Sequence, residues 1–365
     1  MTSEAEALGQ LIACPGDNRR RDRIQAIASA DVRAHLAGFL LRRGGDVAAR
    51  STGLVPVLRA AMDDVSAGAD AGLAFPLPAI VSSLQTDDVD PLCVAARIAG
   101  HFHGCGRKGS WRAEFRTPCS IRFGRSMTPP VRAVAVDGDA IDCSNGLRPL
   151  GLVPIGQQGY LLLAGHEDAD ALGLDTTKPL ATGGMPERIG EIRSAIELIR
   201  SVAPDYLDWC ADTVRIVAAW AGHRERASSG SVPGHPGLIY CSSPLHPVRI
   251  AESLIHEAAH QHFHLAQSEV RLHTLRDEGE YWQPYVQANR PIERILLAYH
   301  AFANVMLFYQ QLASLPDEDV QRRAGFALAQ HRPNVTLFEG YLDRSDGLTP
   351  ASRALYRTLA ERVAA

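Results

Sequence analysis

The stretch LIHEAAHQHFH, residues 254–264, sets two histidines four positions apart and places a glutamate directly after the first: His256, Glu257 and His260. On an α-helix, positions four apart are separated by one turn and differ by about 40° around the axis, so both imidazoles can bind one cation. Glu257 lies about 100° further round, where it can reach a bound water without being a ligand. The pattern predicts a metal-binding helix with His256 and His260 as ligands and Glu257 as a catalytic residue.

The residues around the motif favour this interpretation over a chance match. The helix is expected to run from about Pro247 to Ser268 and to be largely buried, because most side chains next to the motif are apolar. Burying two imidazoles and a carboxylate without partners is costly, and a bound metal removes most of that cost. His262 and His264 are expected to have structural roles, since His264 lies about 12 Å along the axis from His256, too far to share one ion.

A third ligand must come from elsewhere in the chain. The extended zinc-protease pattern is absent, because Phe263 and Ala266 stand where its glycine and third histidine would be. One candidate is His300, in the apolar helix predicted for RPIERILLAYHAFANVMLFYQQL, residues 290–312. The polar residues of this helix lie along one stripe of its surface. His300 is therefore either a core residue whose hydrogen bonds are satisfied within the protein or the third metal ligand, and we favour the ligand. The other candidates are four downstream glutamates, as in other zinc peptidases: Glu269, Glu278, Glu280 and Glu293.

Length and composition restrict the class of protein. With 365 residues, of which 46% are hydrophobic and 21% charged, the chain is expected to be globular with more than one structural unit. A net charge of −4 gives no general attraction for nucleic acid or anionic membranes. We find no signal-like N-terminus, no run of about 20 apolar residues and no C-x-x-C among the seven cysteines. We therefore expect a soluble, cytoplasmic protein.

The pattern along the chain predicts an α+β fold in three parts. Residues 1–70 are expected to be helical, with a break at Gly44 and Gly45, and residues 71–180 to be β-rich and a candidate for peptide recognition. Residues 181–365 are expected to form the helical catalytic part. There we predict helices over 188–203 and 205–222, separated by Pro204, and then a buried strand over 237–243.

The order of several segments resembles a known family. PDYLDWCADTVRIV, PGLIYCSS, AESLIHEAAHQ and RPIERILLAYHAFANV follow one another as in the HEXXH-motif domain family, the α-ketoglutarate-dependent HExxH-type peptide β-hydroxylases. The similarity covers roughly residues 183–315. The segment before the last helix keeps Trp282, Arg290 and Pro291, but it lacks an arginine and an aspartate that family members often carry there.

This resemblance implies a mononuclear iron(II) enzyme that uses α-ketoglutarate (2-oxoglutarate) and O₂ to hydroxylate a β-carbon in a ribosomally made precursor peptide. His256 and His260 match the ligand pair of the family, and His300 matches its downstream histidine. A 2-oxo acid also needs a cation for its far carboxylate, and arginine has the matching planar fork. Arg290 is the first candidate for that anchor, followed by Arg294 and Arg249.

Two other hypotheses stay open at this point. The chain can be a zinc peptidase, in which Glu257 activates water as general base and a downstream glutamate completes the metal site. It can also be a metal-stabilised peptide-binding module without catalytic activity, in which case the coordination of the metal would be closed.

Overall fold

The protein has a mixed α+β fold, as predicted, and it is predominantly helical. The computed structural model describes residues 3–16, 19–66, 90–104, 106–107, 109–124, 126–149, 151–156, 159–164, 185–221, 228–231, 237–243, 245–274 and 276–365. The helices in this part of the chain are α1 (Glu4–Ala13), α2 (Arg19–Arg50), α3 (Leu54–Ser66), α5 (Pro91–Gly104), α7 (Met185–Val202), α8 (Asp205–Thr213), α9 (Pro247–Glu269), α10 (Ile292–Leu312), α11 (Glu318–Arg344) and α12 (Pro350–Ala364). No helix among these is long and apolar enough to cross a membrane.

The largest sheet described has five strands in the order β10-β11-β9-β8-β7. Its three inner strands β8, β9 and β11 run parallel, and the outer strands β7 and β10 pair antiparallel with their neighbours. These strands are β7 (Gly151–Ile155), β8 (Gly159–Ala164), β9 (Ile216–Ala221), β10 (Ser229–Ser231) and β11 (Leu238–Ser243). Parallel neighbours need a crossover connection, and α7 and α8 lie in the chain between β8 and β9.

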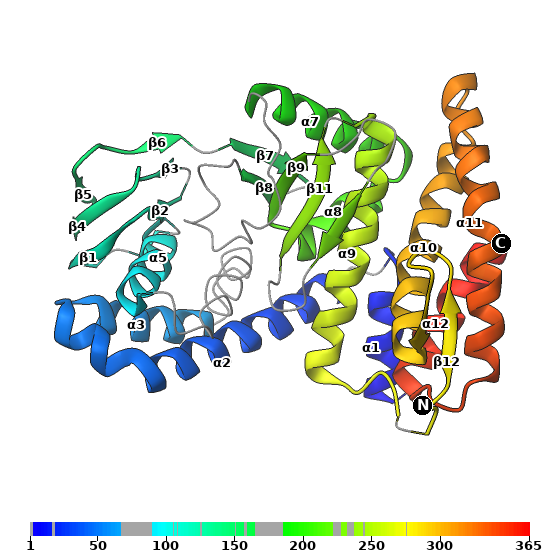
Figure 1. Ribbon diagram of the computed structural model, residues 1–365, viewed down its shortest axis with the longest axis horizontal. Helices are drawn as coiled ribbons and strands as arrows, with labels where there is room; N and C mark the ends of the chain where they lie inside the picture. Colours follow the sequence, from blue (N-terminus) through cyan, green and yellow to red (C-terminus); the bar gives the residue numbers. More distant parts are fainter. Residues whose placement is uncertain are drawn as a thin grey trace.

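Smaller sheets occupy other parts of the structure. Two three-stranded sheets, β1-β4-β5 and β2-β3-β6, lie beside α5 in the N-terminal half (Figure 1). A hairpin, β12-β13, precedes α10. The strands are β1 (Trp111–Cys119), β2 (Arg122–Phe123), β3 (Ser126–Met127), β4 (Val131–Asp137), β5 (Ala140–Cys143), β6 (Arg148–Pro149), β12 (Glu280–Gln283) and β13 (Ala288–Pro291).

The five-stranded sheet includes strands from both sides of residue 180, where the sequence suggested a boundary. β7 and β8 belong to the predicted β-rich part, whereas β9, β10 and β11 belong to the predicted helical part. Leu162 of β8 is the register partner of Ile216 of β9. The strands that support the motif helix therefore come from two of the three predicted parts.

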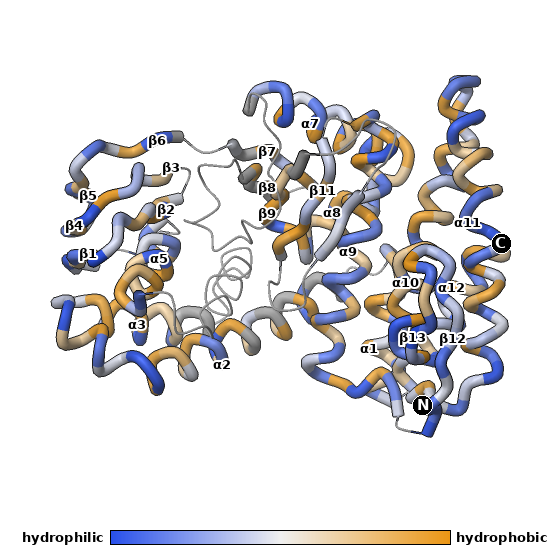
Figure 2. The backbone as a smooth tube through the Cα atoms, in the orientation of Figure 1, coloured by the Kyte–Doolittle hydropathy of each residue, from blue (hydrophilic) through white to orange (hydrophobic). Residues whose placement is uncertain are grey.

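The prediction of a helix over 205–222 was wrong in its second half. The helix ends at Thr213, and residues 216–221 form β9, the middle strand of the sheet. Ile216, Val217 and Ala218 are buried, as expected for a strand with a neighbour on each edge and both faces covered. Figure 2 shows β9 in mostly hydrophobic colours. In contrast, the strand predicted over 237–243 is confirmed as β11.

The predicted helix break at Gly44 and Gly45 was also wrong. α2 continues through both glycines to Arg50, since each glycine costs a helix only about 1 kcal/mol. The chain turns instead at Gly53, which has φ +85° and where a Cβ atom would lie 2.2 Å from the carbonyl oxygen of Ser110. Close approach of another segment, and not local propensity, fixes the position of this turn.

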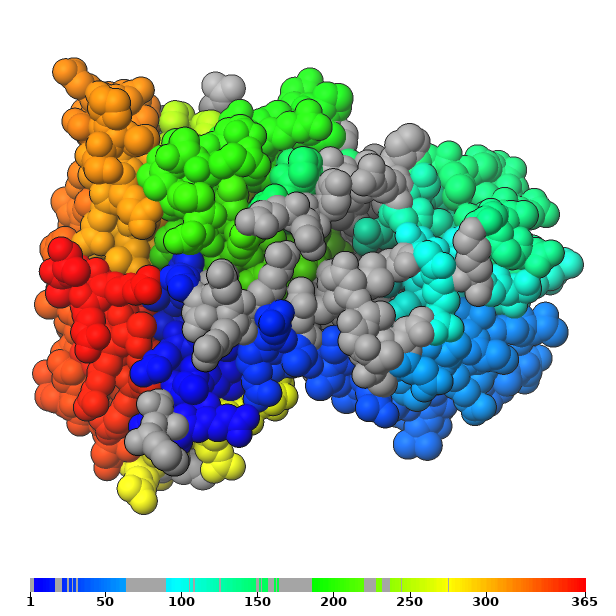
Figure 3. Space-filling view, turned by 180° about the vertical axis from the view of Figure 1, so that it is seen from behind, coloured from blue at the N-terminus to red at the C-terminus, as the bar shows by residue number. Residues whose placement is uncertain are grey.

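Among the described residues, the buried hydrophobic side chains form three clusters. One surrounds the five-stranded sheet with α7, α8 and α9, and the second lies among α2, α3, α5, β1 and β4. The third joins α1, α10, α11 and α12, so residues from both ends of the chain pack together (Figure 3). α2 passes from the third cluster to the second, with Ile27 in one and Leu36 in the other (Figure 1).

The helix predicted over 247–268 is confirmed as α9 (Pro247–Glu269), and it occupies the centre of this arrangement. It contacts α7 and α8 and the strands β10 and β11, and it also packs against α10. α9 therefore lies between the sheet and the C-terminal helices, and its two faces meet different surroundings.

Candidate metal centre

α9 begins and ends with well-formed caps. At its start, Nδ1 of His246 accepts a hydrogen bond from the backbone N–H of Val248 at 3.3 Å, and Pro247 occupies the first turn. At its end, the N–H of Val270 donates to the carbonyl oxygen of Ala266 at 2.9 Å. These caps fix the length of the helix and hence which residues of the motif face the sheet and which face α10.

The imidazoles of His256 and His260 lie side by side on α9. Their ring centroids are 4.7 Å apart and the ring planes are nearly perpendicular, at 87°. Burial first, and then the charges of His331 and His300, lower the pKa of His256 to about 4, and burial also holds the pKa of His260 well below its usual range. Both rings are therefore neutral near pH 7, which is the state that binds metals.

One nitrogen of this pair has no partner. Nδ1 of His260 is buried and makes no hydrogen bond within the described part of the chain. A buried polar atom without a partner is expensive, and a metal ion would satisfy it. The donor types fit the prediction, because imidazole is a common ligand of iron and zinc.

Glu257 extends from the other face of α9, toward the sheet edge. Its side chain is 1% exposed, and its Oε1 accepts a hydrogen bond from Oγ of Ser229 on β10 at 2.6 Å. Burial raises the pKa of Glu257 to about 7, although the hydrogen bond from Ser229 acts in the opposite direction. The carboxyl group therefore changes its protonation state near neutral pH, which suits a group that accepts or donates a proton.

His300 is fully buried on α10, and it is held by the end of α1. Its Nε2 lies 3.0 Å from the carbonyl oxygens of both Ile12 and Ala13. Asn304, one turn later, donates to the same Ala13 oxygen at 2.8 Å. Burial is the main cause of the lowered pKa values of His256 and His260, and the charge of His300 adds to the shift. Nevertheless, no three His, Cys, Asp or Glu side chains in the described ranges are arranged to hold a metal ion.

The four glutamates proposed as alternative ligands lie toward the end of α9 and beyond. Glu293 accepts a hydrogen bond from Nε2 of Gln267 and lies 3.4 Å from Nδ1 of His273. Glu269 is exposed and lies 3.7 Å from Arg23, and Glu278 and Glu280 are exposed in and before β12. Among the four, Glu293 is the one within α10.

The structure distinguishes the two first-named candidates for the 2-oxoglutarate anchor. Arg290 is exposed on the short strand β13, where its register partner is Tyr281. Arg294 is exposed on the first turn of α10, and its charge contributes to the lowered pKa values of His260 and His264. Of the two, Arg294 is the one whose charge bears on the pKa of His260.

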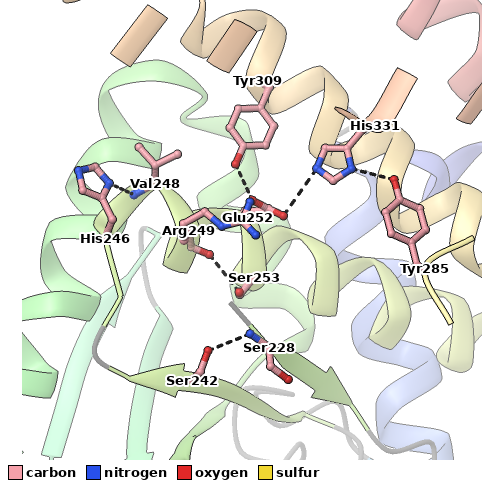
Figure 4. A network of polar contacts seen from close by, with 10 residues as sticks. All are labelled: Ser228, Ser242, His246, Val248, Arg249, Glu252, Ser253, Tyr285, Tyr309 and His331. Atoms are coloured by element: carbon pink, nitrogen blue, oxygen red, sulfur yellow. Dashed lines mark hydrogen bonds and ion pairs between the residues drawn. The ribbon is translucent and has the colours of Figure 1, made fainter. Parts of the chain in front are cut away.

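A polar network next to the pair contains residues that sequence reasoning missed (Figure 4). His331 of α11 is buried; its Nδ1 lies 2.8 Å from the hydroxyl of Tyr285, and its Nε2 lies 3.8 Å from Oε1 of Glu252. Glu252 also accepts hydrogen bonds from Tyr309 and Arg249. Its position four residues before His256 was a usable signal, because it shares the stripe of the ligand pair.

Phe302 separates this network from the pair. Its ring centroid lies 4.7 Å from that of His256 and 5.2 Å from that of His331, and its ring stacks on Tyr285 at 3.7 Å. An apolar ring thus covers one side of His256 and keeps the network residues apart from it.

His262, one of the two further histidines of the motif, has a structural role, as predicted. It is fully buried, its ring stacks on Trp209 of α8, and its Nε2 lies 2.9 Å from the carbonyl oxygen of the same residue. His264 is half-buried and its Nδ1 lies 3.1 Å from Gln267 Oε1.

Comparisons with known proteins add no assignment to this geometry. No protein-family model matches the chain, and no curated protein matches it in sequence.

Proposed function

We propose that the protein is an iron(II)- and 2-oxoglutarate-dependent enzyme that uses O₂ to hydroxylate a residue of a ribosomally made precursor peptide. The observation that carries this proposal is the half-buried, uncharged pair of His256 and His260, with a buried, partnerless nitrogen on His260. The order of the surrounding segments, which resembles the HExxH-type peptide β-hydroxylases, supports the choice of reaction.

Each residue near the pair has a role in this proposal. His256 and His260 would hold the iron. His300 is the proposed third ligand, and to serve as one it would have to turn from its present arrangement, in which its Nε2 lies against the carbonyl oxygens of Ile12 and Ala13. When bound, an iron(II) ion with open positions supplies the activation of O₂ and of the 2-oxo acid. Phe302 excludes water from one side of His256, which strengthens polar interactions there.

The remaining candidate site residues are Glu257 and the arginines, and they would act through their charges. Glu257, tied to Ser229, would orient a ligand or a water as an acceptor. Arg294 would bind the far carboxylate of 2-oxoglutarate, and Arg290 and Arg249 are the alternatives. The peptide substrate requires no nucleic acid or membrane partner.

One observation favours a second candidate, a zinc-dependent metallopeptidase. A general base works best when its pKa lies near the pH of the reaction, and burial raises the pKa of Glu257 to about 7. In this alternative His256 and His260 hold zinc, Glu293 is the remaining candidate on α10 for the third ligand, and Glu257 removes a proton from water.

The first experiment measures metal binding without oxygen. Wild-type protein loaded with iron(II) is expected to bind one ion and to develop the charge-transfer absorbance of a chelated complex when 2-oxoglutarate is added. His256→Ala and His260→Ala should each abolish both signals, and His300→Ala should weaken them. The matched control is His264→Gln, two turns beyond His256, which should bind iron normally. Retention of iron by the His256→Ala variant would refute the site.

The second experiment separates the two activities. An oxygenase converts 2-oxoglutarate to succinate only with iron and O₂, whereas a peptidase cleaves a peptide with zinc and without O₂. Glu257→Gln is expected to keep its metal in both cases. Loss of zinc-dependent peptide cleavage in that variant, together with no succinate from the wild type, would favour the peptidase.

A further inference from the structure

A pocket of about 580 Å³ opens between the first turn of α9, the last turns of α10 and the first half of α11. Its walls include Val248 and Arg249 from α9, Tyr309 from α10 and Arg322 and Phe326 from α11. Neither His256 nor His260 lines it. This volume lies within the range of small-molecule sites, about 300–1,000 Å³.

Positive charge predominates in the wall of the pocket. Three guanidinium groups line it, those of Arg249, Arg322 and Arg323, and two carboxylates pair with them. Arg322 and Arg323 share the single carboxylate of Asp319, whose distance to Arg323 is 2.7 Å. One positive charge is therefore in excess, and the two arginines on α11 have donors left for a ligand, since each carries five N–H groups.

The inner end of the pocket is fixed by the buried network. Arg249 and the hydroxyl of Tyr309 both contact the carboxylate of Glu252 (Figure 4). The N-terminus of α9 also points to this end, and a helix N-terminus carries about half a positive charge. Glu252, which also accepts from Tyr309, pairs with Arg249, whose side chain is 40% exposed at the pocket wall.

The pocket also has apolar lining residues. Phe326 is 73% exposed, which is unusual for a large hydrophobic residue, and it follows Arg322 by one helical turn. Ala327 and Val248 line the same pocket. Cations with an exposed aromatic ring one helical turn away match a molecule that has an anionic group and an apolar body.

We propose that this pocket binds a small organic anion, a carboxylate or phosphate monoester carried on an apolar group. Arg249, Arg322 and Arg323 would bind the anionic group, and Phe326 would pack against the apolar one. The pocket shares no residue with the histidine pair. It does share Arg249 with the alternatives for the 2-oxoglutarate anchor, so the arginine variants of the test are confined to α11.

Calorimetric titration of the full chain tests this site with four probes: phenyl phosphate, benzoate, inorganic phosphate and benzyl alcohol. Phenyl phosphate or benzoate is expected to bind with one-to-one stoichiometry and more tightly than inorganic phosphate or benzyl alcohol. Which of the two binds more tightly tells a phosphate site from a carboxylate site. Affinity should fall as NaCl is added, since the interaction is between charges near the surface.

Variants of α11 assign the interaction to the pocket. R322Q combined with R323Q should weaken binding of the preferred anion at least tenfold while leaving the far-ultraviolet circular dichroism unchanged, because both side chains are exposed. Phe326→Ser should weaken phenyl phosphate or benzoate severalfold but not inorganic phosphate. Arg332→Gln, an exposed arginine of the same helix outside the pocket, is the control and should bind normally.

Two outcomes overturn the proposal. One is the absence of saturable binding of both aromatic anions at millimolar concentration. The other is unchanged affinity in the double arginine variant. His256→Ala should bind the anion like the wild type, so a failure of the metal site and a failure of this pocket are observed separately.

Discussion

Glu252 is a buried carboxylate, and its hydrogen-bond partners determine the free-energy cost of burying it. It is 9% exposed and accepts hydrogen bonds from Arg249 and from the buried hydroxyl of Tyr309. Tyr309→Phe removes one donor and leaves a buried carboxylate with fewer partners. The free energy of unfolding should fall by about 1.5–3 kcal/mol, the range for hydrogen bonds to charged groups. Urea unfolding measures this free energy. The control Tyr341→Phe, at a more exposed position, should change it by less than about 0.5 kcal/mol. A change as small as that in Tyr309→Phe would show that the hydrogen bond to Glu252 does not stabilise the protein.

The protonation of Glu252 makes stability depend on pH. Burial raises the pKa of Glu252 above its ordinary value of 4.5, with Arg249 and Tyr309 opposing the shift. Between the unfolded and the folded pKa, the folded protein holds a proton that the unfolded chain has released. Stability contributed by this group therefore falls as the pH rises through that interval.

Glu252→Gln should remove this dependence. Melting temperatures measured from pH 4.5 upward should decline less steeply in the variant than in the wild type, since the amide does not titrate. Parallel curves for the two proteins would mean that Glu252 is ionised at low pH in the folded state, contrary to its raised pKa.

The sequence was informative about single residues only where chemistry and spacing coincide. His256 and His260 were predictable because a spacing of four places two imidazoles on one side of any helix. His331 was not, because its proximity to Glu252 depends on how α11 packs on α9, which no local pattern encodes. For the same reason, the sequence could not show that the backbone carbonyl oxygens of Ile12 and Ala13 would lie against the ring of His300.

Among the secondary-structure elements, α1 and α12 approach each other closely enough for a clear test. A Cβ atom added at Gly9 would lie 2.0 Å from the carbonyl oxygen of Ala351, and backbone atoms cannot move aside cheaply. Gly9→Ala should destabilise the protein by about 1–3 kcal/mol or more, as overpacking does.

The control uses a glycine in an open helical position. Gly190 of α7 has nothing within 4 Å of an added Cβ, so Gly190→Ala should stabilise the protein by about 0.5–1 kcal/mol. The two thermal denaturation curves should move in opposite directions. If Gly9→Ala also stabilised the protein, the close crossing of α1 and α12 would be wrong.

Predictions of elements succeeded where a segment's own pattern decides its structure. α9 has a proline at its start and continuous apolar faces, and α7 and α8 are separated by Pro204, so their positions were readable. Residues 216–221 were not, because IVAAWA satisfies a buried helix and a buried strand equally. The pairing of this segment with β8 and β11 decides that it forms a strand. Both partner strands are distant from it in sequence.

At the scale of the whole molecule, two of the core clusters have few elements in common. The cluster of α2, α3, α5, β1 and β4 connects to the rest through α2, whose Ile27 belongs to the cluster of α1 and α10. Such an arrangement favours unfolding in two steps, because a large chain with separate cores is not required to melt as one unit.

The final prediction uses the metal to tell the two steps apart. Manganese(II), an air-stable stand-in for iron, should stabilise only the part that contains α9 and α10, by about 2.7 kcal/mol at one hundred times its dissociation constant. Leu58→Ala in α3 should lower the other transition, since creating a cavity at a fully buried leucine costs about 2–5 kcal/mol. Leu296→Ala in α10 should lower the metal-sensitive one instead. Differential scanning calorimetry measures both transitions; a single transition that moves as a whole in all cases would show that α2 couples the cores into one cooperative unit.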